Sequence, residues 1–242
     1  MNGFIASLQF ISTLPLGKSR PFDPRGIRIH FPLAGLAIGL MLTLFDQAAS
    51  ALWPDAVAAV LDVVLLAVIS GAFHLDGLAD MADGLYGHRE HDQTLAIMKD
   101  SRVGAMGVVA VVCVLLVKTV ALASLTKARF VALLIVPAYA RAAMIFGMRW
   151  LPYVRGEEGT GSPFFSTPLS IADFRFVLVP VLLSLLLGWR GVLLNIFFGL
   201  GLGALILLYR RKLGGVTGDL LGAMVEIMEA ILFVAVCIGG DP

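Results

Sequence analysis

The chain has 242 residues, of which 59% are hydrophobic and only 14% are charged. Because soluble domains usually carry about a quarter charged residues, this composition excludes an ordinary soluble enzyme and predicts an all-α, polytopic integral membrane protein. The formal net charge of +1 indicates no partner by itself. A lipid bilayer is the expected surrounding, and no nucleic-acid partner is expected.

The N-terminal segment is the first predicted element. Phe4, Leu8 and Ile11 stand at helical spacing, which predicts a short helix within residues 2–15 that lies at the membrane interface. No basic region precedes these apolar residues, so a cleavable signal peptide is not expected.

Long apolar stretches follow at intervals along the rest of the chain. A bilayer core needs about 20 apolar residues per helix, and the predicted spans are residues 33–53, 56–75, 104–125, 130–149, 172–188, 191–209 and 220–239. No soluble domain fits between them. Residues 1–242 are therefore interpreted as one transmembrane domain of about seven helices.

The distribution of lysine and arginine predicts the orientation, because cytoplasmic loops carry an excess of these residues. With a cytoplasmic N-terminus, only Lys127, Arg129 and Arg190 lie on the opposite side, while Lys118 and Arg141 lie inside spans. The remaining thirteen of the 18 basic residues fall in cytoplasmic segments. This bias places residues 74–103, 150–171 and 210–219 in the cytoplasm and the two termini on opposite sides.

Three aspartates follow the second apolar stretch. Asp76, Asp80 and Asp83 fall within roughly 60° of arc on one helical face. Like charges held so close repel each other, and a divalent cation compensates them most simply; carboxylate oxygens suit Mg²⁺. The alternative is a solvated polar turn between two apolar helices. His74, two residues before the first aspartate, is a candidate acid–base group or a residue that orients a ligand.

A second polar cluster, Lys99-Asp100-Ser101-Arg102, comes before the third span. Cations beside a metal-binding carboxylate face are what a phosphate site requires, so these four residues are predicted to bind substrate. The alternative is that the two basic residues only anchor the following span at the cytoplasmic surface.

A third candidate segment combines glycines with acidic residues. Gly214 and Gly215 precede a predicted helix, whose N-terminus is a ready anion site. Asp219, Glu226 and Glu229 then share a helical face of about 80°, and the first two are candidate metal or base residues. The alternative interpretation makes Asp219 a helix cap and pairs the two glutamates with Arg141 or Lys118.

Two arginines complete the set of candidate substrate-binding residues. Arg141 lies in the middle of a predicted span and needs a counter-charge. Arg155 opens a polar, glycine-rich loop over residues 155–165, which either closes over a substrate or merely connects two spans.

Three segments together identify a family resemblance: His74-Leu-Asp-Gly-Leu-Ala-Asp80-Met-Ala-Asp83-Gly, Ile97-Met-Lys-Asp-Ser-Arg102-Val-Gly and Gly214-Gly-Val-Thr-Gly-Asp219-Leu-Leu-Gly-Ala. They resemble the cobalamin synthase family, the adenosylcobinamide-GDP ribazoletransferases. The similarity begins at Phe10-Ile-Ser-Thr-Leu-Pro15 and runs to the last span. The first two motifs are the most specific.

The resemblance implies a Mg²⁺-dependent enzyme of the bacterial inner membrane whose active site faces the cytoplasm. Its substrates would be adenosylcobinamide-GDP and α-ribazole or α-ribazole 5′-phosphate, and GMP would leave. Asp76, Asp80 and Asp83 would then be metal ligands, and Lys99 and Arg102 would bind phosphate. The oligomeric state is left open, a homo-oligomer included.

Two other classes have intramembrane acidic residues. A CDP-alcohol phosphotransferase would have Asp-Gly followed by Ala-Arg, whereas Asp76-Gly is followed by Leu-Ala-Asp80. A cation transporter would place its acidic residues near the bilayer midplane on broken helices, whereas the aspartates here cluster at predicted cytoplasmic ends. Both classes are therefore less favoured than the transferase.

Overall fold

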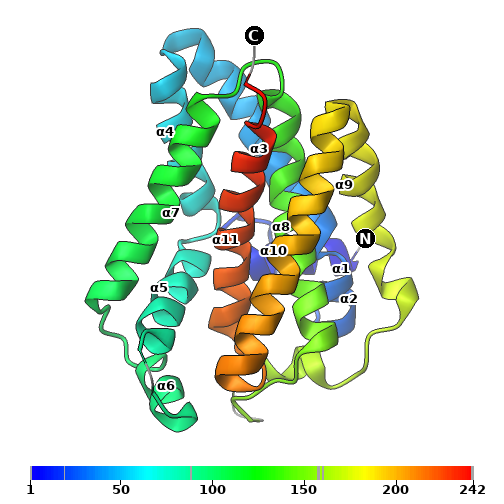
Figure 1. The fold of residues 1–242 in the computed structure, drawn as a ribbon. Helices are drawn as coiled ribbons and strands as arrows, with labels where there is room; N and C mark the ends of the chain where they lie inside the picture. Colours follow the sequence, from blue (N-terminus) through cyan, green and yellow to red (C-terminus); the bar gives the residue numbers. More distant parts are fainter. Residues whose placement is uncertain (1, 19, 88, 157–158, 160, 241–242) are drawn as a thin grey trace.

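The computed structural model describes residues 2–18, 20–87, 89–156, 159 and 161–240. Within these ranges the regular structure is helical (Figure 1), apart from one isolated β-bridge between Tyr153 and Val216. The helical structure confirms the all-α prediction. The helices are α1 (Asn2–Ile11), α2 (Pro24–Ile29), α3 (Phe31–Leu52), α4 (Asp55–Ile69), α5 (Phe73–Leu85), α6 (His91–Ile97), α7 (Ala105–Ala123), α8 (Arg129–Trp150), η1 (Ser162–Phe165), η2 (Ile171–Val177), α9 (Leu178–Leu183), η3 (Ser184–Leu187), α10 (Trp189–Leu213) and α11 (Gly218–Val236).

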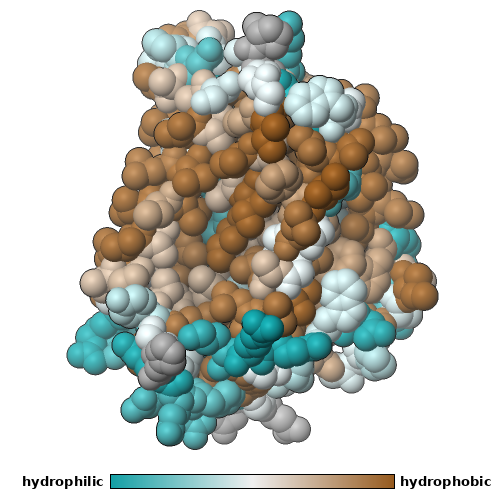
Figure 2. All heavy atoms as spheres, in the orientation of Figure 1, coloured by the Kyte–Doolittle hydropathy of each residue, from teal (hydrophilic) through white to brown (hydrophobic). Residues whose placement is uncertain are grey.

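The surface of the molecule matches a membrane protein. Figure 2 shows a broad hydrophobic band with a strongly hydrophilic zone at the lower end, where α6 and the lower ends of α10 and α11 lie in Figure 1. By length and composition, four helices are able to span a bilayer: α3, α7, α8 and α10. The bent pair formed by α4 and α5 makes a fifth.

The predicted count of seven spans is therefore not confirmed. Helix α11, which corresponds to the seventh predicted span, has 19 residues but carries Asp219, Glu226 and Glu229, which an isolated span in lipid would not tolerate. The predicted span 172–188 is built from a 3₁₀ segment, a short α-helix and a second 3₁₀ segment instead of one α-helix.

The predicted span 56–75 is also interrupted. Its helix α4 ends at Ile69, and α5 begins at Phe73 after a bend of 89°. Gly71 and Ala72 both adopt positive φ values, 61° and 57°, in the turn, a region that a residue with a Cβ rarely enters. The bend starts a new helix just before the acidic stripe, so His74 belongs to the stripe's own helix.

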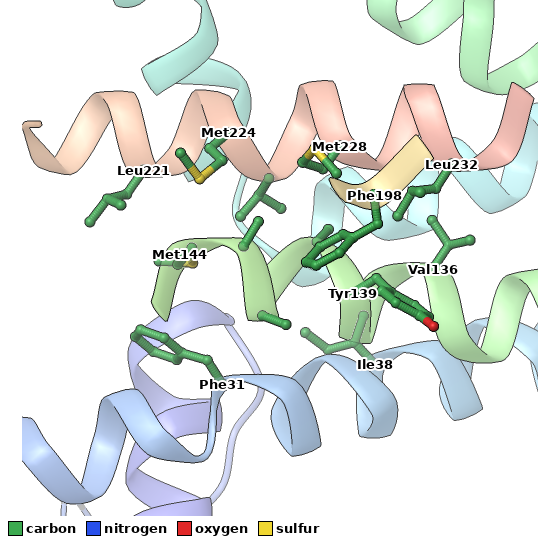
Figure 3. Packing of buried hydrophobic residues seen from close by; sticks show 14 of the residues in the cluster. Phe31, Ile38, Val136, Tyr139, Met144, Phe198, Leu221, Met224, Met228 and Leu232 are labelled. Atoms are coloured by element: carbon green, nitrogen blue, oxygen red, sulfur yellow. The ribbon is translucent and has the colours of Figure 1, made fainter. Parts of the chain in front are cut away.

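Helix α8 forms the centre of the bundle and is buried along most of its length. Figure 3 shows it between α3 and α11, with Ile38 of α3 on one side and Met228 and Leu232 of α11 on the other. Tyr139 of α8 packs edge-on against Phe198 of α10 at 5.2 Å and donates a hydrogen bond to Asn195. The core therefore fixes α11, which carries the third predicted motif, against the middle of the molecule.

A buried ion cluster joins three helices near the start of α8. Arg129 donates to Asp46 of α3 and to Asp62 of α4, each at 2.9 Å. Arg129 is predicted to lie on the side opposite the cytoplasm, and its side chain is only 6% exposed. The pairing explains how aspartates are accommodated within α3 and α4, since a buried charge needs a partner.

The predicted N-terminal helix is present as α1. It packs against α2 and α3 through buried residues that include Ala6, Leu8 and Ile11. It ends at Ile11, earlier than the predicted limit of residue 15. Its position at a membrane interface stays a prediction.

Candidate active site

Helix α5 crosses the N-terminal end of α11, and glycines make the approach possible. A Cβ on Gly77 would lie 2.6 Å from the carbonyl oxygen of Asp219, so any side chain at residue 77 would force the two helices apart. Gly222 of α11 in turn lies against the backbone of His74. The crossing brings the first and third predicted motifs together although about 140 residues separate them in sequence.

An acidic cluster lies at this crossing. Asp80 is half-buried and interacts electrostatically with Asp219 and Asp76, and also with Arg155. Asp76 is exposed one turn earlier on α5. Arg155 forms an ion pair with Asp219, with 2.6 Å between its Nη2 and Oδ2, and donates to the carbonyl oxygen of Met98 at 2.9 Å. The site therefore combines two aspartates of the predicted stripe, Asp76 and Asp80, with Asp219 and Arg155.

Asp83, the third aspartate of the stripe, has a separate role in the structure. Its two carboxylate oxygens accept hydrogen bonds from the backbone N–H groups of Gly104, at 2.7 Å, and Gly107, at 2.9 Å. These groups belong to the first turn of α7, whose N–H groups lack partners within the helix. A Cβ on Gly107 would lie 2.5 Å from the Asp83 carboxylate. Asp83 therefore fixes α7, and the loop before it, to the acidic helix.

The Lys99–Arg102 segment lies in the loop that Asp83 anchors. Arg102 grips Asp100 with two side-chain nitrogens, the closer at 2.6 Å, and Lys99 and Ser101 are exposed. The hydrogen bonds from the Arg102 side chain lower the pKa of the Asp100 carboxyl to about 2, so this pair is charged on both sides at neutral pH.

A polar cavity of about 260 Å³ separates this segment from the end of α5. Asp83, Asp100 and Arg102 line it, and so do Tyr86 and Arg89. Arg89 is one of the thirteen basic residues that predict the orientation, and neither Arg89 nor Tyr86 is among the predicted site residues. Their only signal is a place just beyond the acidic helix, which no spacing rule marks as a site.

The two glycines before α11 have structural reasons to be there. Gly214 ends α10 in a left-handed conformation at φ 68°, the usual place for a glycine after a helix. The segment after it pairs with residues 152–154, since Val216 donates to Pro152 at 2.8 Å and Val154 donates to Val216 at 3.1 Å. A Cβ on Gly215 would collide with Pro152. This pairing of residues 152–154 with Val216 places Arg155 beside Asp219, where the two form their ion pair.

His74, Glu226 and Arg141 lie apart from the exposed site, in a buried polar cluster. Lys118 of α7 donates to Glu226 and Glu229, each at 2.5 Å, and Arg141 of α8 forms an ion pair with Glu229. Both glutamates are therefore paired with Lys118 or Arg141, as the alternative interpretation holds. Thr217, and not Asp219, is the residue that caps α11.

His74 is fully buried beside this cluster, and neither ring nitrogen has a hydrogen-bond partner. Glu226 is 3% exposed, so both of these predicted catalytic residues are buried, whereas Asp76 of the acidic cluster is exposed.

Only part of the predicted loop over residues 155–165 can be described, because residues 157, 158 and 160 lie outside the described ranges. Its later part is anchored: buried Arg28 of α2 donates to the carbonyl oxygens of Phe164 and Thr167, the latter at 2.7 Å. Tyr153 packs against Phe165 at 5.0 Å. These contacts favour a connecting role for residues 161–167.

The carboxylates have the chemistry that a divalent metal requires, but not a closed geometry. Asp76, Asp80 and Asp219 offer hard oxygen donors within one electrostatic neighbourhood, which suits Mg²⁺. Among the described residues, however, no three histidine, cysteine, aspartate or glutamate side chains converge as a ready metal cluster. An ion at this place would need the carboxylates to turn toward one point.

Comparison with known proteins agrees with the three motifs. A sequence model of the family described as "Cobalamin-5-phosphate synthase" matches residues 3–237. The adenosylcobinamide-GDP ribazoletransferase of Brevibacillus brevis is 35% identical over 240 residues, which cover 96% of each chain. Proteins of the same name from Pseudomonas putida (strain KT2440) and Geotalea daltonii are 38% and 37% identical, with 98% of each chain covered.

No solved structure matches significantly. The family model and these relatives both cover nearly the whole chain, including α5, the loop before α7 and the start of α11. The chain belongs to the cobalamin-5-phosphate synthase family.

Proposed function

We propose that this protein is an adenosylcobinamide-GDP ribazoletransferase that depends on Mg²⁺. The observation that carries the proposal is the crossing of α5 and α11, which gathers Asp76, Asp80 and Asp219 from two of the motifs that resemble the family and places Arg155 beside them. The 3′-hydroxyl of α-ribazole, or of its 5′-phosphate, attacks the phosphorus that carries cobinamide. The bond from that phosphorus to the GMP oxygen breaks, and GMP leaves.

Phosphoryl transfer depends mostly on positioning and on neutralising charge at the phosphate oxygens. Asp76, Asp80 and Asp219 would hold Mg²⁺, and the bound ion would neutralise charge on the phosphate oxygens. Asp83 is not needed as a ligand in this arrangement, because its oxygens already hold the N-terminus of α7. An aspartate of the cluster accepts the proton of the attacking hydroxyl.

The cations around the cluster have separate tasks in this proposal. Arg155 is tied to Asp219 and to Met98, so it is placed to bind a phosphate oxygen beside the carboxylates. Arg102 offers the Nη1 side of its guanidinium, since Asp100 holds the Nε and Nη2 side, and Lys99 offers a point charge for the diphosphate. His74 and Glu226 act indirectly: His74 lies against Gly222 where α5 meets α11, and Glu226 joins α11 to α7 through Lys118.

We further propose that the site faces the cytoplasm from the bacterial inner membrane. The hydrophilic end in Figure 2 includes α6 and the last turn of α10, with Arg210, Arg211 and Lys212. An excess of basic residues is typical of cytoplasmic ends.

The decisive experiment is an assay of purified protein with adenosylcobinamide-GDP, α-ribazole and Mg²⁺. The expected result is release of GMP together with the joined corrinoid, loss of both on chelation, and recovery with added Mg²⁺. Full turnover in excess chelator would contradict the metal. Mg²⁺ uptake into proteoliposomes without GMP release would point to a transporter instead.

A further inference from the structure

The polar cavity between the end of α5 and the start of α7 differs from the larger cavities of the molecule. One of these, of about 520 Å³, is lined by apolar residues of α4, α5, the turn between them and α7, apart from Thr119. A charged ligand there would lose its hydration without gaining a partner, which costs several kcal/mol. The polar cavity of about 260 Å³ lies at the hydrophilic end and is lined by two arginines.

Its two arginines come from different elements and point to one ligand class. Arg89 follows α5 and is held near the cavity, since its Nη1 donates to the carbonyl oxygen of Asp83 at 3.2 Å. Arg102 is anchored through Asp100, yet its side chain is still 87% exposed. Guanidinium groups grip phosphate oxygens with two parallel hydrogen bonds. A phosphate group entering between α5 and α7 would meet both, since the two carboxylates that also line the cavity are already engaged, Asp83 with backbone N–H groups and Asp100 with Arg102.

The cavity also has an aromatic wall. Tyr86 is the first residue after α5 and is 58% exposed. An exposed aromatic ring beside two phosphate-binding cations is the combination that holds a nucleotide, because the base stacks on the ring while the cations take the phosphate.

The cavity adjoins the acidic cluster through α5 itself. Asp83 lines the cavity, and Asp80, one turn earlier on the same helix, interacts electrostatically with Asp83 as well as with Asp219. A nucleotide in the cavity would therefore direct its phosphate end toward the carboxylates at the α5–α11 crossing.

We propose that this cavity is the subsite for the guanosine nucleotide that leaves in the reaction, with Arg89 and Arg102 on its phosphate and Tyr86 against its base. This inference rests on the proposed function, and it adds Arg89 and Tyr86 to the substrate-binding residues. Lys99, which does not line the cavity, would contact the second phosphate.

The test is equilibrium dialysis of radiolabelled GMP with the detergent-solubilised full chain in the presence of Mg²⁺. Arg89→Ala removes a charge-assisted contact, so GMP binding should weaken about tenfold or more, with partial recovery in Arg89→Lys. Tyr86→Ala should weaken GMP binding, whereas Tyr86→Phe should bind GMP like the parent. In the turnover assay, inhibition of GMP release by inorganic pyrophosphate should be the same in Tyr86→Ala as in the parent.

The matched control is Arg211→Ala, which removes an exposed arginine at the same end of the molecule but outside the cavity. It should bind GMP like the parent. A melting temperature equal to the parent's qualifies each variant for comparison, and the Tyr86 pair remains informative if Arg89→Ala does not fold.

The outcomes separate the two proposals. If the parent releases no GMP from adenosylcobinamide-GDP, the proposed function fails. If the parent turns over but Arg89→Ala and Tyr86→Ala bind GMP like the parent, the function stands and the subsite is wrong. Absence of any measurable GMP binding by an active parent would also overturn the subsite.

Discussion

Aspartates on one helical face can have different tasks, as Asp80 and Asp83 show. Asp80 belongs to the acidic cluster with Asp76 and Asp219, whereas both oxygens of Asp83 bind the first turn of α7. We therefore expect Asp80→Asn to lower turnover at least about a hundredfold with little change in melting temperature. Comparison of GMP release with thermal unfolding in detergent checks this, and parent-like turnover would remove Asp80 from the site.

Asp83→Ala should behave differently. It removes the cap of α7, a loss that typically costs about 0.5–2 kcal/mol, so the melting temperature should fall. Turnover should fall with it, because the Lys99–Arg102 loop is no longer fixed. Asp83→Asn keeps one acceptor oxygen and should be milder in both measurements. An Asp83→Ala variant that is inactive but fully stable would instead support the original prediction of a metal ligand.

The sequence predicts the site's residue types better than their roles. Helical spacing is sufficient to place Asp76, Asp80 and Asp83 on one face, because that depends only on local geometry. It does not reveal that Asp83 caps a helix more than 20 residues later, since a cap depends on how two elements meet. The sequence does not identify Arg89 and Tyr86 as site residues for the same reason, since only the folded chain places them around a cavity with Arg102.

At the scale of elements, the α5–α11 crossing depends on a missing side chain. Gly77→Ala would put a Cβ 2.6 Å from the Asp219 carbonyl oxygen, and overpacking of this kind costs about 1–3 kcal/mol. We expect lower stability and a larger loss of GMP release, because Asp219 moves away from Asp80. Gly203→Ala is the matched control: Gly203 lies within α10 and a Cβ there meets nothing within 4 Å.

The control should be neutral or slightly stabilising, since glycine inside a helix costs roughly 0.5–1 kcal/mol relative to alanine. Equal losses in the two variants would show that the crossing has no special sensitivity.

The helix predictions are correct where a single apolar stretch covers the whole helix. Helices α3, α7, α8 and α10 match predicted spans to within a few residues at most ends. The failures have identifiable causes. The 89° bend at Gly71 and Ala72 interrupts a stretch that is apolar on average, so hydropathy does not mark it. Helix α11 lies close to the predicted residues 220–239, but it carries glutamates that are paired with residues of α7 and α8, which hydropathy does not show.

At the scale of the whole molecule, those partners hold the bundle together. Lys118, Arg141, Glu226 and Glu229 form a buried cluster with two positive and two negative charges from three helices. Removing one member leaves an uncompensated buried charge, which typically costs about 3–5 kcal/mol. Lys118→Met should therefore lower the melting temperature strongly, and Lys118→Met with Glu226→Gln should recover part of it. A double variant less stable than the single one would contradict this account.

Orientation in the membrane can be tested at the two ends of the bundle. In a background with Cys113→Ala and Cys237→Ala, Asp92→Cys in α6 should react with an impermeant thiol reagent only from the cytoplasmic side. Lys127→Cys, in the turn between α7 and α8, should react only from the other side. Both positions are exposed. Labelling of residue 92 from the periplasm would reverse the proposed topology.

The crossing of α5 and α11 also means that the proposed active site combines residues from two parts of one chain. Asp76, Asp80 and Arg155 come before the exposed Gly156, and Asp219 comes after it. Fragments 1–156 and 157–242, expressed separately, each lack part of the site and should be inactive. Expressed together, they should restore activity, because α11 packs extensively on α5 and α8 and because Lys118 and Arg141 of the first fragment neutralise the glutamates that α11 alone could not carry in lipid. The polypeptide could then be cut at this loop, although both fragments would be needed to form the site.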